Sequence, residues 1–231
     1  MEFNKSLIKG KLVKRYKRFF VDVRLNKEII TAHCPNTGSM KGLLDEDNEV
    51  FISKNDNPKR KLKYTLEIIK VKRNLVGVNT HFANKIAYHG LSNNLIRELV
   101  NNDNIKSEVY FNNETRFDFF IEKKKKKIFV EVKNVTLFRD LKVAEFPDAV
   151  TSRGSKHLKT LIEAKKKGYE AYLLFLIQIQ GVESFKIAND IDKEYYENYL
   201  LAKKAGVKFL AYRCKISAKA IKIEKKLIIT S

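Results

Sequence analysis

Residues 116–137 read RFDFFIEKKKKKIFVEVKNVTL, with two apolar stretches on either side of a run of five lysines. Because successive side chains of a strand point to opposite faces, the two stretches predict neighbouring antiparallel strands joined by a lysine-rich hairpin. If that hairpin is centred between Lys124 and Lys125, Asp118 lies directly opposite Glu131, and opposed residues share a face. The stretch therefore predicts a mixed or antiparallel sheet on which two carboxylates converge.

Two opposed carboxylates inside an apolar sheet repel each other unless a cation or a proton relieves them. Oxygen ligands of this kind suit Mg²⁺ or Mn²⁺, and magnesium keeps waters and substrate phosphate oxygens in its remaining positions. Asp118 and Glu131 are therefore candidate metal ligands, and Lys133 on the same strand face is a candidate for orienting a water or neutralising developing charge. This set of groups indicates hydrolysis of a phosphodiester bond. The alternative is a surface strand on which Glu131 and Lys133 form an ordinary ion pair.

The charge of the chain indicates what it binds. It has 231 residues and a formal net charge of +20, from 47 basic and 27 acidic side chains. Such an excess predicts attraction to a polyanion, because contacts with phosphates release their condensed counterions. Nucleic acid, DNA or RNA, is the expected partner, and an anionic membrane is the competing alternative, although no basic amphipathic helix stands out.

Length and cysteine content predict a two-domain cytoplasmic protein. At 231 residues the chain is longer than one typical domain of about 100–150 residues. No stretch approaches the roughly 20 apolar residues of a membrane span, and the first residues lack the apolar run of a secretory signal. Cys34 and Cys214 have no paired spacing, which predicts the absence of a disulfide framework.

The first 83 residues alternate like strands and predict an N-terminal domain. Five or six short antiparallel strands with alternating basic positions are typical of a closed barrel of the oligonucleotide-binding (OB) type. The interruption CPNTGSMKGLLDEDN begins at Cys34 and predicts a turn that leads into a short helix capped by Ser39. Met40, Leu43 and Leu44 would then face inward. The CPNTGSM segment itself has two open roles beyond a structural turn, facing DNA or facing the other domain.

Residues 84–231 predict a second domain with helices on a mixed sheet. Apolar residues at helical spacing predict a helix over 93–102, followed by three strands, a helix over 151–168 and an unbroken apolar strand over 169–180. A further helix ends near Gly206, and two strands complete the chain. The predicted order is therefore helix, three strands, helix, strand, with a helix and two strands after it.

Several cations of this domain are candidate nucleic-acid contacts. Arg153 and Lys156 lie three residues apart near the start of a predicted helix, so they project together beside its partly positive N-terminus. The structural alternative is a capped helix in which Arg153 pairs with a carboxylate. His157 is either a helper of this site or a buried polar group. Lys124 and Lys125, at the hairpin tip, are either solvated or in contact with a phosphate backbone.

Asp118, the hairpin and Glu131-Val132-Lys133 resemble the signature of the PD-(D/E)XK nucleases, and the predicted helix-strand-strand-strand-helix-strand order matches that superfamily. Glu98, on the helix predicted before these strands, occupies the place where many members of the superfamily carry an additional acid. This resemblance implies that Glu98 assists the catalytic set, whereas a solvent-facing glutamate is the alternative.

Four separated motifs, in order along nearly the whole chain, resemble the sugar fermentation stimulation protein A (SfsA) family. They are HCPNTGSM at 33–40, RFDF at 116–119, VEVKNVTL at 130–137 and FPDAVTSRGSKHLKTL at 146–161. The resemblance implies an OB-like barrel, a nuclease-like second domain and DNA binding with little sequence preference. It leaves open whether the protein is a Mg²⁺-dependent nuclease or a non-catalytic DNA-binding regulator of sugar or maltose metabolism, and whether it forms a homodimer.

Overall fold

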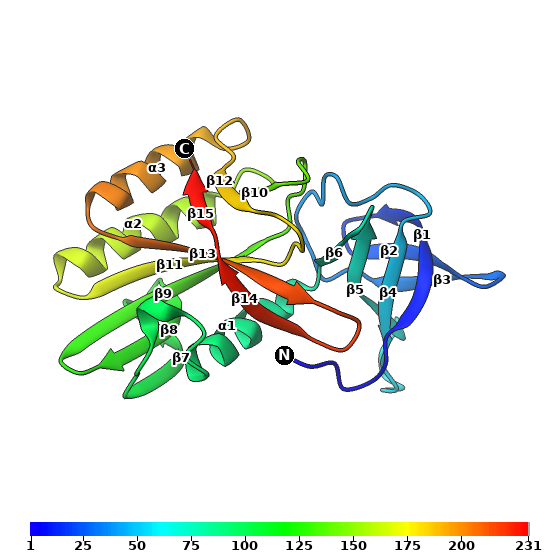
Figure 1. Ribbon diagram of the computed structural model, residues 1–231, viewed down its shortest axis with the longest axis horizontal. Coiled ribbons are helices and arrows are strands. Elements are labelled where there is room, and N and C mark those ends of the chain that lie inside the picture. Colours follow the sequence, from blue (N-terminus) through cyan, green and yellow to red (C-terminus); the bar gives the residue numbers. More distant parts are fainter. Residues whose placement is uncertain (231) are drawn as a thin grey trace.

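The structure is a computed structural model that describes residues 1–230, and it consists of two domains packed side by side (Figure 1). The N-terminal domain is a small barrel of strands, whereas the second domain places helices on both faces of a larger mixed sheet. This is the fold class expected from the sequence. It follows from the change in hydrophobic period, from alternation in the first third of the chain to helical spacing and buried strands afterwards.

The N-terminal domain is a closed barrel of the OB type. Its strands are β1 (Ile8–Tyr16), β2 (Phe20–Leu25), β3 (Glu28–His33), β4 (Glu49–Lys54), β5 (Tyr64–Val71) and β6 (Asn74–Gly77). They pair in the order β3-β2-β1-β4-β5-β6, and an additional pairing of β3 with β5 closes the first five strands into a ring. The closing pairs are Ala32 with Tyr64 and His33 with Thr65. Closure removes the free strand edges, as the predicted barrel requires.

The CPNTGSM segment connects β3 to β4 and faces the second domain. Asn36 donates a 3.3 Å hydrogen bond from Nδ2 to Oγ1 of Thr136. Gly38 lies so close to the carboxylate of Asp148 that a Cβ at this position would overlap it. Of the two open roles, contact with the other domain is therefore the one that the structure shows.

The short helix expected after Ser39 does not form. Met40 adopts a left-handed backbone conformation with φ of +53°, and the chain turns there instead of continuing into a helix. The expected burial is found nevertheless, because Met40 and Leu43 are fully buried and Leu44 is half-buried. Burial of apolar residues was thus predicted correctly, while the local backbone was not.

The second domain is built around a six-stranded mixed sheet of order β14-β13-β11-β9-β8-β7. Its strands are β7 (Asn104–Tyr110), β8 (Arg116–Lys123), β9 (Lys126–Val135), β11 (Glu170–Ile177), β13 (Lys208–Ile216) and β14 (Ile221–Lys226). The three central strands β9, β11 and β13 run parallel, and the others pair antiparallel. Seven of the eight residues of β11 are buried, as expected of a strand with helices on both faces.

A small parallel sheet lies beside the large one and was not predicted. It is formed by β10 (Val143–Phe146), β12 (Ser184–Ile187) and β15 (Ile228–Thr230). Two of these strands are only four residues long, too short for a periodic pattern to mark them. The C-terminal stretch that was expected to form one strand is divided between β14 and β15.

Three α-helices cover the sheet within residues 1–230: α1 (Ala83–Ser92), α2 (Ser152–Lys166) and α3 (Lys193–Lys204). Helices α2 and α3 lie together on one face and α1 lies on the other (Figure 1). Thr151 caps α2 by accepting a 3.0 Å hydrogen bond from the backbone N–H of Gly154. None of the helices in this part of the chain has the length and apolar character of a membrane span.

The helix predicted over 93–102 is misplaced. Helix α1 occupies residues 83–92, preceded by the 3-10 turn η1 (Thr80–Phe82), and the chain beyond Asn93 forms only the turn η2 (Arg97–Leu99). The apolar residues Ile96 and Leu99 are buried as predicted, but they belong to the segment around η2, which packs with α1 against the sheet. Apolar residues at helical spacing were therefore buried here without forming an α-helix.

The domains are joined by backbone pairing as well as by the connecting chain. The N–H of Gly77 donates to the carbonyl of Gln178 at 2.9 Å, and the N–H of Gln180 donates to the carbonyl of Leu75 at 2.9 Å. These bonds place β6 of the barrel directly against the loop that follows β11. The barrel is thereby fixed next to the end of the sheet.

Candidate metal centre

The β8–β9 hairpin has the register expected from the sequence. Lys123 pairs with Lys126 and Phe119 pairs with Val130, so the turn consists of Lys124 and Lys125. Carried one residue further, this register places Asp118 opposite Glu131. The paired ladder stops at Phe119, however, and the two strands separate at the two acids. Their side chains consequently line a common cavity.

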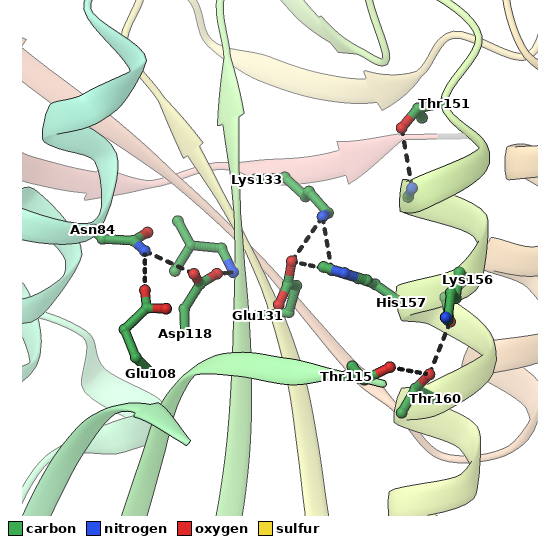
Figure 2. A network of polar contacts seen from close by, with 12 residues as sticks. Asn84, Glu108, Thr115, Asp118, Glu131, Lys133, Thr151, Lys156, His157 and Thr160 are labelled. Carbon is green, nitrogen blue, oxygen red and sulfur yellow. Dashed lines mark hydrogen bonds and ion pairs between the residues drawn. The ribbon is translucent and has the colours of Figure 1, made fainter. Parts of the chain in front are cut away.

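Glu131 is buried and bound from two sides (Figure 2). Its Oε1 accepts a 2.7 Å hydrogen bond from Nζ of Lys133 and also contacts Nδ1 of His157. The Lys133 amine lies 3.2 Å from the same imidazole nitrogen. His157 comes from α2 and is itself buried, so the helix fixes the carboxylate on the side of the sheet covered by α2. The alternative of an exposed surface ion pair is excluded, since only 3% of Glu131 is exposed.

Asp118 is bound from the opposite side of the cavity. Its Oδ2 accepts a 2.7 Å hydrogen bond from the backbone N–H of Val132, and its Oδ1 accepts one of 2.7 Å from Nδ2 of Asn84. Asn84 belongs to the first turn of α1 and also contacts Glu108 at 3.4 Å (Figure 2). The two acids therefore have separate hydrogen-bond partners, and each set includes one side chain from a helix, Asn84 of α1 for Asp118 and His157 of α2 for Glu131.

The electrostatics of the two acids differ. Burial, followed by the charge of Glu131, raises the pKa of Asp118 to about 6. Burial also acts to raise the pKa of Glu131, but the charge of Lys133 and the contact with His157 outweigh it and hold that pKa below its usual range. At neutral pH both groups are ionised, and Asp118 carries a negative charge that its hydrogen-bond donors only partly compensate.

The donor set fits a divalent cation. Oε2 of Glu131 is buried and has no hydrogen-bond partner within residues 1–230, although its other oxygen has two. A buried carboxylate oxygen without a partner is costly, and a cation beside Asp118 would relieve it. The described residues contain no group of three or more His, Cys, Asp or Glu arranged to hold a metal. Such an ion would depend on water or substrate oxygens for its other ligands, which is the usual situation of magnesium.

The cavity around the acids has a volume of about 680 Å³, and its lining combines the cations Arg116, Arg153 and Lys156 with the exposed acids Glu108 and Glu114. Arg153 and Lys156, the two predicted phosphate ligands, both line it from the first turns of α2. Lys156 forms a 2.8 Å ion pair with the exposed Glu114, whereas Arg153 makes no ion pair within residues 1–230. The helix N-terminus adds further positive potential at this place.

The structure does not bring every predicted site residue to this cavity. Glu98 lies on η2 and accepts a 2.8 Å hydrogen bond from the hydroxyl of Tyr212, while its other oxygen pairs with Lys226. It is separated from the acids because the helix that was expected to carry it does not form. Lys124 and Lys125 are at the far end of the hairpin from Asp118, roughly 20 Å away at about 3.3 Å per strand residue.

Sequence reasoning missed several residues of the cavity, among them Asn84 and Glu108 beside Asp118, and it left the role of His157 undecided. Asn84 was overlooked because its helix was predicted ten residues too late, and amides carry no motif of their own. Glu108 has a positive φ of +58° and interrupts the β7–β8 register. The alternation of side chains along the strand therefore did not predict to which face its side chain points. His157 had been noted beside Lys156, and only its spacing to the apolar stripe of α2 indicated that it points inward.

Comparisons with known proteins agree with this architecture. A family model described as "Sugar fermentation stimulation protein RE domain" matches residues 81–220, and one described as "SfsA N-terminal OB domain" matches residues 13–78. The chain is 79% identical over 227 residues to the sugar fermentation stimulation protein homolog of Pelagibacter ubique, and the match covers 98% of each chain. The homolog of Pseudoalteromonas atlantica is 44% identical over 231 residues, again covering 98% of each.

A solved structure shows the same arrangement over the whole chain. It is that of Pyrococcus furiosus SfsA in complex with Ca²⁺, which superposes with a TM-score of 0.89 at 26% sequence identity. The match covers 100% of this chain and 98% of the Pyrococcus protein. Both domains and their relative placement are therefore shared. The chain belongs to the SfsA family of sugar fermentation stimulation proteins.

Proposed function

We propose that this protein binds DNA with little sequence preference and hydrolyses phosphodiester bonds with a divalent cation, Mg²⁺ or Mn²⁺, held by Asp118 and Glu131. The observation that carries the proposal is the buried, unpartnered Oε2 of Glu131 in the cavity that Asp118 also lines. The Pyrococcus relative was solved in complex with Ca²⁺, which supports a site for a divalent cation in the family. Calcium and magnesium share the same oxygen ligands.

The protein's own residues would hold the reacting groups in place. Lys133 and His157 keep Glu131 ionised and fix one of its oxygens, which leaves the other available to the cation. Asn84 and the backbone N–H of Val132 orient the carboxylate of Asp118 in the same way. The bound cation would supply charge stabilisation to the phosphorus centre and lower the pKa of a water. The Lys133 ammonium adds positive charge where negative charge develops on the phosphate oxygens.

Substrate binding is proposed to depend on Arg153 and Lys156, the two cations that α2 contributes to the cavity. Arg153 can form two parallel hydrogen bonds with a phosphate, and Lys156 can exchange its exposed ion pair with Glu114 for one with the nucleic acid. Lys124 and Lys125 would contact the nucleic-acid backbone at a second place, about 0.6 of a turn of duplex away at roughly 34 Å a turn. Net charge favours DNA and RNA alike, so the experiment below compares both polymers in single- and double-stranded form.

The second candidate is a DNA-binding regulator that does not cleave. It is favoured by the small number of ligands, since no third His, Cys, Asp or Glu within residues 1–230 completes a metal-binding group with the two acids. In this case the cation would stabilise the two carboxylates and the domain around them without activating a water. DNA binding would then be independent of Lys133.

The decisive experiment is incubation of the purified protein with single- and double-stranded DNA and RNA in Mg²⁺, Mn²⁺ or chelator. Asp118→Ala and Lys133→Ala are compared with Asp45→Ala, a matched change at an exposed loop position. We expect metal-dependent cleavage by the parent and the control variant, and none by the other two, with DNA binding retained by all. If the parent cuts no substrate while every variant binds DNA normally, the nuclease proposal is wrong and the regulator remains.

A further inference from the structure

A second cavity, of about 720 Å³, lies where the barrel meets the start of α1. Three separate parts of the chain line it: residues 1–5, the strand ends and the β4–β5 loop of the barrel, and residues 79–85. It is located at the seam where β3 and β5 close the barrel. His33, the first residue of the HCPNTGSM motif, is one of the closing residues and faces this cavity.

Three groups that can carry positive charge converge at this seam. The ring of His33 lies 6.5 Å from the ring of His81, measured between centroids. Arg60 donates a 3.2 Å hydrogen bond from Nη2 to Oγ1 of Thr65, the residue paired with His33 on the neighbouring strand. The guanidinium is therefore held next to the two imidazoles. Burial, and then the charges of Arg60 and His81, lower the pKa of His33, as expected when cationic groups face each other.

Two of the acids that also line the cavity have other partners, since Glu2 pairs with Lys222 and Asp56 with Lys5. Within residues 1–230, neither the two histidines nor Arg60 has an ion-pair partner within 4.0 Å. The third acid of the cavity lining is Glu67, which is only 3% exposed. Its oxygens accept hydrogen bonds from Ser53 at 2.6 Å and from Asn79 at 2.7 Å. The charge of Arg60 also acts on Glu67, but no hydrogen bond or ion pair joins the two within residues 1–230, so the N–H donors of the guanidinium and imidazoles are not used up by this acid.

We propose that His33, Arg60 and His81 bind a phosphate monoester. A guanidinium and two imidazoles offer directed N–H donors, and the charge-assisted hydrogen bonds of a guanidinium to phosphate are among the strongest that proteins make. The cavity exceeds the size of a phosphate ion and falls in the range of small-molecule sites, about 300–1,000 Å³. Phe3 and Phe82 supply an apolar wall, with ring centroids 5.9 Å apart, against which the attached nucleoside can pack.

The position of this cavity relates it to the candidate metal centre. Phe82 and Lys85 line the phosphate cavity, whereas Asn84 between them binds Asp118. The two sites therefore lie on either side of the first turn of α1, a separation on the order of the 10–12 Å diameter of a helix. The phosphate would be that of a strand end close to the cleavage site, or of a free nucleotide released there. This assignment of the phosphate rests on the proposed function.

The test measures binding in chelator, where no cleavage occurs. Fluorescence anisotropy compares the affinities of labelled DNA oligonucleotides with and without a phosphate at the 5′ or the 3′ end. Calorimetry measures the binding of adenosine monophosphate and of inorganic phosphate. We expect the phosphate to increase affinity roughly tenfold. Arg60→Ala and His33→Gln should abolish that difference, whereas Lys61→Ala should keep it because this exposed neighbour lies outside the cavity lining.

Each result decides the matter. A preference for one phosphorylated end that Arg60→Ala removes identifies a strand-end site. Binding of the mononucleotide without an end preference, lost in the same variant, identifies a free nucleotide as the source. If the unsubstituted protein binds neither the phosphorylated oligonucleotides nor the mononucleotide more tightly because of the phosphate, the inference is wrong. This holds even if cleavage in Mg²⁺ supports the nuclease proposal. Thermal unfolding of Arg60→Ala, a loop position, verifies that its losses do not arise from misfolding.

Discussion

Asp118, which lies one residue beyond the last pair of the β8–β9 ladder, accepts a hydrogen bond of 2.7 Å from the backbone N–H of Val132. The carboxylate thus replaces the carbonyl that a continuing strand would have offered. This substitution lets the two strands separate without leaving a buried amide unpaired. The opening so produced is the cavity in which Glu131 and Arg153 are also found.

Asp118 should cost stability at neutral pH when no metal is present. Its pKa is about 6 in the folded chain against an ordinary value of 3.8, so folding binds this proton more tightly and stability falls as pH rises from about 4 to about 6. Asp118→Asn should therefore raise the free energy of unfolding at pH 7 by roughly 1–3 kcal/mol, and by little at pH 4. Urea unfolding in chelator measures this. Asp45→Asn serves as the exposed control, and an unchanged or lower stability at pH 7 would contradict the prediction.

Divalent ions should bind more tightly as pH rises from 5 to 7. A metal competes with the proton of Asp118, so affinity should increase by roughly tenfold per pH unit below the pKa of about 6 and level off above it. Calorimetric titration with Mn²⁺ or Ca²⁺ gives the profile. In Asp118→Asn both the affinity and its pH dependence should be lost. A profile that is flat across this range in the parent would show that Asp118 is not a ligand.

His157→Ala should destabilise the fold by about 1–3 kcal/mol at pH 7, because a buried carboxylate loses one of its partners. His157 and Lys133 hold the pKa of Glu131 below its usual range, so their stabilisation is present above the ordinary glutamate pKa. It is lost as pH falls through the lowered value. Chemical unfolding at pH 7 and in the acid range measures the difference. His89→Ala, on α1, is the control, and equal losses at both pH values would argue against an electrostatic role.

Lys133→Met should separate chemistry from binding. The substitution keeps the aliphatic part of the side chain but removes the ammonium that binds Glu131 at 2.7 Å. We expect cleavage to slow by on the order of 10²–10³-fold, as for other single groups that stabilise transition-state charge. DNA affinity should change by less than about tenfold, since one of many cations is removed. A comparable loss in both measurements would instead indicate that Lys133 serves mainly in binding.

Salt dependence should identify the phosphate contacts of α2. For duplex DNA each neutralised phosphate contributes about 0.9 to the slope of log affinity against log salt concentration. The double variant Arg153→Ala, Lys156→Ala should lower that slope by roughly 2, measured by anisotropy between 50 and 300 mM salt, a range of about sixfold. Lys159→Ala, three residues further along the same helix and exposed, should leave the slope unchanged. If Lys159→Ala reduced the slope equally, the total charge of α2 would matter for DNA binding and the position of each cation on the helix would not.

The sequence by itself determined the hairpin and the classes of both domains. The register of β8 and β9 follows from local rules, because side chains alternate with a period of two and a two-residue turn fixes which residues oppose each other. Asp118 and Glu131 could therefore be paired without any long-range information. The same alternation in the first 83 residues, and the apolar run of β11, were enough for the barrel and for a sheet covered on both faces.

Only the tertiary structure decided which residues surround the two acids. Asn84 lies 34 residues from Asp118 along the chain, and His157 lies 26 residues from Glu131. Such contacts depend on how α1 and α2 pack against the sheet, which periodicity does not specify. The helix predicted around Glu98 was wrong for the same reason. The apolar residues of this segment are buried against the sheet without a helical backbone. The phosphate cavity likewise exists only because barrel closure brings β3 next to β5, and both next to the start of α1.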